Sequence, residues 1–110
     1  MMYLQQNLKK IDDMHRSLGC PTFHYWRPVK GEQHWCIWYE EGEANSFHGD
    51  DHKAEQNIQG RTHVYTHVEY DPVLDSVQGM LDELCLSWAL NSVQFEEDTN
   101  TIHYEWIWEA

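Results

Sequence analysis

Residues 61–70, RTHVYTHVEY, alternate strictly between two sets of side chains. One set is Thr62, Val64, Thr66, Val68 and Tyr70, and the other is His63, Tyr65, His67 and Glu69. Because successive side chains of a strand point to opposite faces, this period of two predicts a strand with one buried and one more polar face. The chain must therefore build a sheet and cover at least one of its faces.

Four further segments have the composition of strands: 21–26, 34–40, 92–98 and 101–109. The segment HWCIWYE at 34–40 is rich in aromatic and β-branched residues on both of its faces, which predicts a strand near the sheet centre with both faces covered. The last two strands are expected to form a closing hairpin through Asp98–Asn100.

Two amphipathic helices are expected, over residues 3–18 and 72–86. The first carries apolar residues at helical spacing and ends before Gly19 and Pro21, which favour a left-handed cap and a stop. The second begins with Asp71 as cap and Pro72 at the first helical position.

These elements predict one α+β domain spanning residues 1–110. Its order is helix, three strands, helix, two strands (α-β-β-β-α-β-β), with a mostly antiparallel sheet of four to five strands. Both helices should pack mainly on one face of this sheet. The sheet residues expected to meet their apolar stripes are Val64, Val68, Tyr104 and Trp106.

The net charge of −12 disfavours binding to nucleic acid or to anionic membranes, because both carry negative charge. No stretch has the composition of a signal peptide or of a membrane span. The cysteines at 20, 36 and 85 are odd in number and far apart, which predicts reduced thiols and no disulfide framework.

Residues 41–60 are expected to be a long loop, and such loops are commonly functional. Within it, His48 and His52 stand four residues apart, as metal ligands on one helical face would. Gly49 and the neighbouring aspartates disfavour a helix, so a solvated loop is the main interpretation. A metal-dependent hydrolase remains an alternative; its ligands would be His48, Asp50, Asp51 and His52.

His63 and His67 share a strand face, where a paired general base is conceivable, but a solvated or interface-facing surface is the preferred interpretation. Metalloprotease, serine-hydrolase and nucleotide-binding motifs are absent from the sequence. We therefore predict no catalytic residues, no cofactor and no enzymatic activity.

Four segments in order resemble a known family. They are LGCPTFHYW after the first helix, CIWYEEGEANSFHGDDH, THVYTHVEYDPVLDSVQGMLDE and the closing pair of strands. Together they resemble the small tail-terminator or head–tail joining proteins of siphophages and prophages of Gram-positive bacteria. The resemblance covers nearly the whole chain and rests on the order and spacing of short motifs.

The resemblance implies a structural virion protein, present in the host cytoplasm before assembly. Six copies would form a hexameric ring that caps the tail tube and contacts the head-completion proteins. It also implies that four residues form the subunit interface: Asn45, Ser46, Phe47 and Asp50. Phe47 would be the apolar anchor of that interface.

DNA would pass through such a ring without specific binding, and acidic side chains facing the channel would repel its phosphates. Simple solubility is an equally good explanation of the negative charge. A small protein-binding adaptor, such as a host-interaction or anti-defence protein, is the other alternative to the ring.

Overall fold

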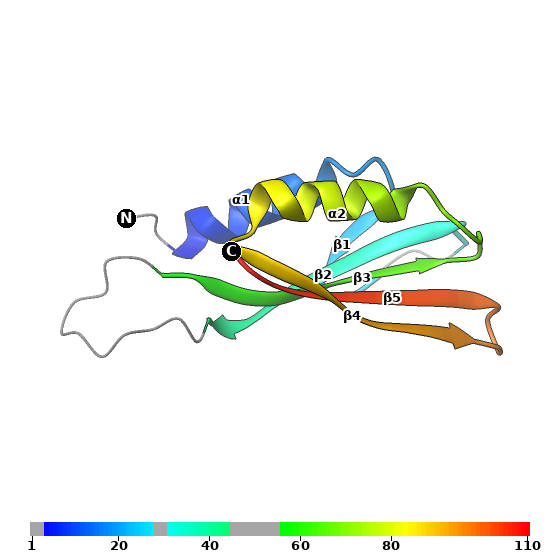
Figure 1. The fold of residues 1–110 in the computed structure, drawn as a ribbon. Coiled ribbons are helices and arrows are strands. Elements are labelled where there is room, and N and C mark those ends of the chain that lie inside the picture. Colours follow the sequence, from blue (N-terminus) through cyan, green and yellow to red (C-terminus); the bar gives the residue numbers. More distant parts are fainter. Residues whose placement is uncertain (1–3, 28–30, 45–55) are drawn as a thin grey trace.

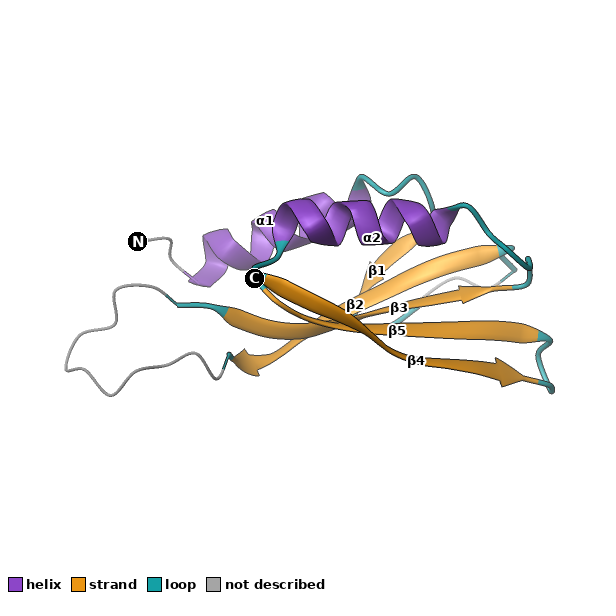
Figure 2. Ribbon diagram, in the orientation of Figure 1, coloured by secondary structure: helices purple, strands orange, loops and turns teal. Residues whose placement is uncertain are grey.

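A computed structural model describes residues 4–27, 31–44 and 56–110 of the chain. Two helices lie side by side on one face of a five-stranded sheet (Figures 1 and 2). In chain order the elements are α1 (Leu4–Arg16), β1 (Thr22–His24), β2 (His34–Glu43), β3 (Ile58–Thr66), α2 (Val73–Leu84), β4 (Ser87–Glu96) and β5 (Thr101–Glu109). The predicted α+β class and element order are thereby confirmed.

The sheet has the strand order β1-β2-β3-β5-β4. Short β1 runs parallel to β2, while every other neighbouring pair is antiparallel, so the sheet is mixed. The parallel pair is possible because a connection runs between β1 and β2 and returns the chain to the same end of the sheet.

Large aromatic side chains fill the space between the helices and the sheet. Trp38 of β2 and Trp106 and Trp108 of β5 are at most 1% exposed. They meet Ile11 of α1 and Leu81 of α2, which are fully buried in the same cluster. Burial of three indoles is a large apolar contribution for a chain of 110 residues.

Both predicted helices are present but shorter than expected. Helix α1 ends at Arg16 instead of residue 18, and Gly19 then adopts the expected left-handed backbone at φ 81°. Helix α2 runs from Val73 to Leu84 instead of from residue 72 to 86, and Pro72 stands at its N-cap instead of at its first helical position. Asp71 precedes this N-cap residue, and its carboxylate accepts a hydrogen bond from the Val73 backbone N–H at 2.9 Å, as a capping side chain does.

Strand β3 is displaced from its predicted range of 61–70. It begins at Ile58 and ends at Thr66, where the Thr66 hydroxyl donates to the Asp71 carboxylate at 2.7 Å and turns the chain toward α2. Val68 therefore lies beyond the strand and outside the buried core, contrary to its predicted role, and Tyr70 is 86% exposed. Val64 and Trp106 are buried in the core as predicted, and Tyr104 packs against it.

Strand β4 begins at Ser87, five residues before the predicted start at 92, and ends at Glu96. The early start follows from pairing with the whole length of β5, as Trp88 stands opposite Trp108. Strand β5 has the predicted bounds, 101–109. The closing hairpin is thus longer than its own apolar pattern indicates.

The predicted loop at 41–60 is strand at both ends. β2 continues to Glu43 and β3 begins at Ile58, and these two residues are paired. The Ala44 backbone N–H donates to the Asn57 carbonyl at 2.9 Å, which holds the two described ends of the connection together. Residues 45–55 lie outside the described part of the chain.

The cysteines at 20, 36 and 85 are free, and the first two are buried. Among residues 4–27, 31–44 and 56–110, neither helix has the length and apolar character needed to cross a membrane.

Candidate functional site

The sheet face turned away from the helices is the main candidate site, and we call it the open face. No described element covers it (Figure 2). Strand alternation places nine central side chains there: Trp35, Ile37, Tyr39, Arg61, His63, Tyr65, His103, Glu105 and Ile107. The prediction that both faces of the 34–40 strand are covered is therefore wrong within the described residues. The helices cover only the face of Cys36 and Trp38.

A row of stacked rings crosses three strands of the open face. Trp35, Tyr65 and His103 stand directly opposite one another in the register of β2, β3 and β5. The Trp35 and Tyr65 rings lie 5.2 Å apart at 11°, and the Tyr65 and His103 rings lie 4.1 Å apart at 19°. The Arg27 guanidinium lies over the Trp35 ring, 3.7 Å from its centroid, as a cation–π contact.

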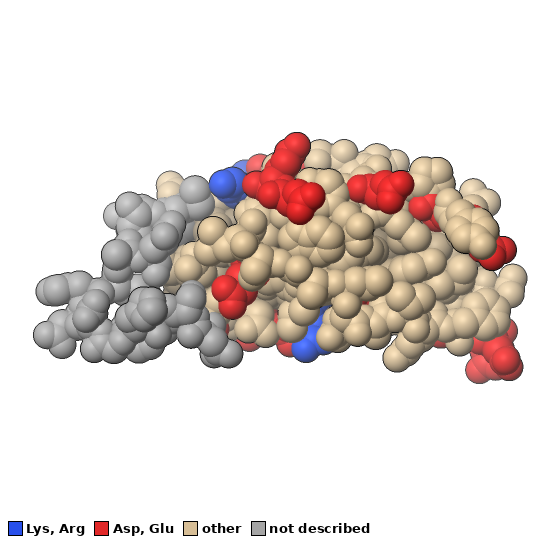
Figure 3. Space-filling view, viewed as in Figure 1, with Lys and Arg blue, Asp and Glu red and all other residues tan. Residues whose placement is uncertain are grey.

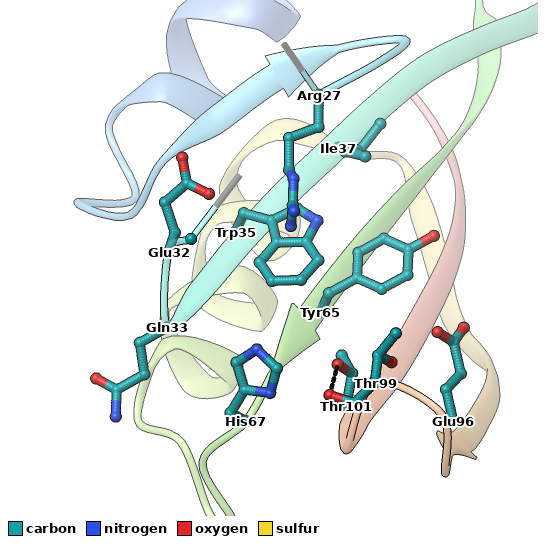
Figure 4. A pocket seen from close by; sticks show the side chains of 11 residues that line it. Arg27, Glu32, Gln33, Trp35, Ile37, Tyr65, His67, Glu96, Thr99 and Thr101 are labelled. Atoms are coloured by element: carbon teal, nitrogen blue, oxygen red, sulfur yellow. Dashed lines mark hydrogen bonds between the residues drawn. The ribbon is translucent and has the colours of Figure 1, made fainter. Parts of the chain in front are cut away.

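A hollow of about 660 Å³ opens beside this row (Figure 4). Trp35 and Tyr65 form its apolar floor, and Arg27 reaches over that floor. Polar side chains line the opposite wall, where the end of the β4–β5 hairpin contributes Glu96, Thr99 and Thr101. An apolar floor with a polar rim is the arrangement found in protein–protein contacts and in small-molecule pockets.

The structure joins His63 to His103 across the sheet. Their Nδ1 and Nε2 atoms are 2.7 Å apart, and the Tyr39 hydroxyl lies 3.0 Å from His63 Nε2. Burial lowers the pKa of both histidines, so both are neutral at pH 7. The ring nitrogens of His63 are thus occupied by neighbouring side chains.

His67 is not hydrogen-bonded to His63, although the sequence places both on one strand face. Its Nδ1–H donates to the Asn100 carbonyl at 3.0 Å, beyond the end of β3. The structure therefore does not place His63 and His67 together as a paired general base. The histidine that contacts His63 is His103.

Glu105 is held at the centre of the open face by neighbouring donors. The Asn91 amide donates to its carboxylate at 2.7 Å, and the Arg61 guanidinium donates at 3.1 Å. Burial alone would raise the pKa of Glu105, but these hydrogen bonds outweigh burial and lower it. Glu105 is therefore ionised and paired, which does not suit a general acid.

Residues 48–52, which include the alternative metal ligands His48, Asp50, Asp51 and His52, lie outside the described residues. So do Asn45, Ser46 and Phe47, the other predicted interface residues. Within the part of the chain that the structure does describe, no three acidic, histidine or cysteine side chains are grouped to hold a metal ion.

The row of stacked rings is not predicted by the sequence alone. Aromatic residues at alternate positions of the 34–40 and 61–70 segments were a usable signal that each strand has an aromatic face. Which ring meets which depends on strand register, which the separate segments do not encode.

Acidic side chains outnumber basic ones on the side of the molecule in Figure 3, mainly over α2 and at the end of the β4–β5 hairpin.

No protein-family model matches this chain, and no curated protein sequence matches it significantly.

Proposed function

We propose that this protein is a structural component of a phage or prophage tail. In this proposal copies form a ring, as hexamers, that caps the tail tube and contacts a head-completion protein. The order of elements agrees with the order of the segments on which the family resemblance rests. The protein would act in the virion, after a period in the host cytoplasm.

The open face is the observation that carries this proposal. Its central ionisable groups are bonded to one another, as in the contact of His63 with His103 and the clamp on Glu105. Its stacked rings and shallow hollow offer an apolar surface instead. Tyr, Trp and Arg are the residue types enriched where proteins meet, and all three are present in this hollow.

A ring requires that each copy present two different surfaces, because only head-to-tail contacts close into a ring. In the proposal the open face is one of these surfaces. The segment carrying Asn45, Ser46, Phe47 and Asp50 contributes to the other, as the resemblance implies. DNA would pass through the lumen, where acidic side chains would keep it from binding.

Particle assembly in cells that carry the phage genome tests the proposal. Deleting the protein should leave heads and tails unjoined in electron micrographs, and supplying it from a plasmid should restore complete particles. Both Phe47→Asp and Trp35→Ala should fail to restore them, because each removes an apolar anchor from a contact between copies.

Trp26→Ala is the matched control for Trp35→Ala. Trp26 is 68% exposed and lies outside the hollow, so its loss removes a similar ring without touching the proposed contact. Thermal unfolding of each purified variant establishes that it is folded. Complete particles from the deletion strain, or from both anchor variants, would contradict the proposal. A protein found bound to a host factor and absent from particles would favour the adaptor alternative.

A further inference from the structure

Strand β4 forms one edge of the sheet and has β5 as its only described neighbour. Its outer backbone N–H and C=O groups are thus available to another strand. Three apolar side chains along it are exposed: Leu90 by 46%, Val93 by 51% and Phe95 by 58%. No other described strand combines a free edge with such a stripe.

Apart from a bulge at its middle, this edge lacks the devices that usually block pairing between proteins. Edge strands are commonly short, or carry lysine, proline or an inward-pointing charge. β4 has ten residues, SWALNSVQFE, and its single charged residue is Glu96 at the end. The chain has 19 acidic residues, yet only one of them lies on this exposed apolar edge. An exposed apolar edge without protecting charges indicates a surface that contacts another protein.

A bulge in the middle of β4 brings its four large apolar residues onto one face, while Ala89 stands opposite Ile107 on the open face. The pairing with β5 shifts register between Leu90 and Ser92. The four large apolar residues before and after the shift stand opposite residues of β5 on the helix side of the sheet. These pairs are Trp88 with Trp108, Leu90 with Trp106, Val93 with Tyr104 and Phe95 with Ile102.

The stripe that results reads nearly the same in both directions. From the centre between Asn91 and Ser92, the first large apolar residues outward are Leu90 and Val93, and the next are Trp88 and Phe95. In a regular strand, residues at these positions would point to opposite faces. The bulge adds one extra residue to β4, which shifts the alternation of side chains by one position. Leu90 and Val93 therefore point to the same face.

We propose that β4 pairs antiparallel with β4 of a second copy of this chain, about a two-fold axis between Asn91 and Ser92. Leu90 then stands opposite Val93 of the other copy, and Trp88 stands opposite Phe95. Glu96 faces Ser87, so no like charges are opposed. The two sheets become one continuous sheet, with all four helices on one side.

A second copy fits this edge better than an unrelated strand because the strand is complementary to itself. A two-fold contact uses the same patch twice and closes on itself, so it cannot build the ring proposed above. The contact is therefore a property of the free protein, and it would cover the apolar edge outside the particle. Since each copy carries a net charge of −12, repulsion opposes the contact, and added salt should strengthen it.

Sedimentation velocity across the micromolar range measures the association. We expect a concentration-dependent dimer whose Kd falls as salt is added. Val93→Lys should raise that Kd about tenfold or more, because it places a charge in the apolar stripe. Tyr70→Lys is the matched control, since it also exchanges an exposed apolar side chain for lysine, but outside the sheet, and it should leave the Kd unchanged.

Disulfide cross-linking tests the register. In a Cys85→Ala background, a mixture of Leu90→Cys and Val93→Cys proteins should form a covalent dimer on mild oxidation. Each variant alone should not, because its new thiols lie too far apart across the two-fold axis. This test measures geometry and does not depend on the Lys variant being folded.

Three results would overturn the proposal: a monomer at all concentrations, a dimer unaffected by Val93→Lys, or equal cross-linking of the single variants and the mixture. A monomer whose β4 amides become protected from hydrogen exchange only when tail tube protein is added would assign the edge to that partner. Each of these results leaves the ring proposal standing, because the ring is tested by the particle assembly of the Trp35 and Phe47 variants.

Discussion

Replacing Thr62 by valine should strongly destabilise the fold, because Thr62 joins two buried polar side chains. The Trp108 indole N–H donates to the Thr62 hydroxyl oxygen at 2.8 Å. That hydroxyl is 2.7 Å from His15 Nε2, and His15 Nδ1 is 2.8 Å from the Ile11 carbonyl. A carbonyl can only accept, so His15 donates from Nδ1 and Nε2 accepts the Thr62 proton. The three side chains are at most 1% exposed.

The expected cost follows from the two partners that valine would abandon. Valine preserves the branched shape of threonine but removes its hydroxyl, so the change creates almost no cavity. The Trp108 N–H and His15 Nε2 would then be buried without partners, at about 1–3 kcal/mol each. The loss of about 2–6 kcal/mol is a large share of the roughly 5–15 kcal/mol by which domains are stable.

Urea unfolding followed by tryptophan fluorescence and by circular dichroism measures this loss. Thr99→Val is the control, because Thr99 is exposed in the β4–β5 turn and should change stability by less than about 0.5 kcal/mol. The result that would refute this reasoning is a loss of less than about 1 kcal/mol in unfolding free energy, with an unchanged dependence on urea concentration. The hydrogen bonds among Thr62, His15 and Trp108 would then not be what stabilises this core.

Two further predictions concern the same core. Burial lowers the pKa of His15 from 6.5 to about 4, so the unfolded chain binds this proton first as the pH falls. The unfolding free energy should therefore drop by up to about 3 kcal/mol as the pH falls from 6.5 to about 4, and should level off below pH 4. Urea unfolding measured across this pH range should show that His15→Gln removes this part of the pH dependence. Gly60→Ala should cost about 1–3 kcal/mol, because its Cβ would lie 2.5 Å from the Trp108 ring and 2.7 Å from the Tyr39 carbonyl oxygen. Gly79→Ala, in the open on α2, should instead raise the thermal midpoint, and equal shifts in the two variants would contradict the packing argument.

The element order, the helices and the bounds of β5 could be predicted from the sequence. Each depends on local periodicity or on a local start or stop signal, such as Asp71 before α2 or Gly19 after α1. Such signals act over a few residues, and a linear chain displays them fully. The acidic charge, which disfavours nucleic acid as a partner, is likewise a property of composition.

Features that depend on pairing between distant segments required the tertiary structure. The early start of β4 is set by its partner β5, and the contact between His63 and His103 joins residues 40 positions apart. The bulge that aligns Leu90 with Val93 is likewise visible only against β5. Periodicity tells which side chains share a face, but register decides which of them touch, and register is fixed by contacts across the whole sheet.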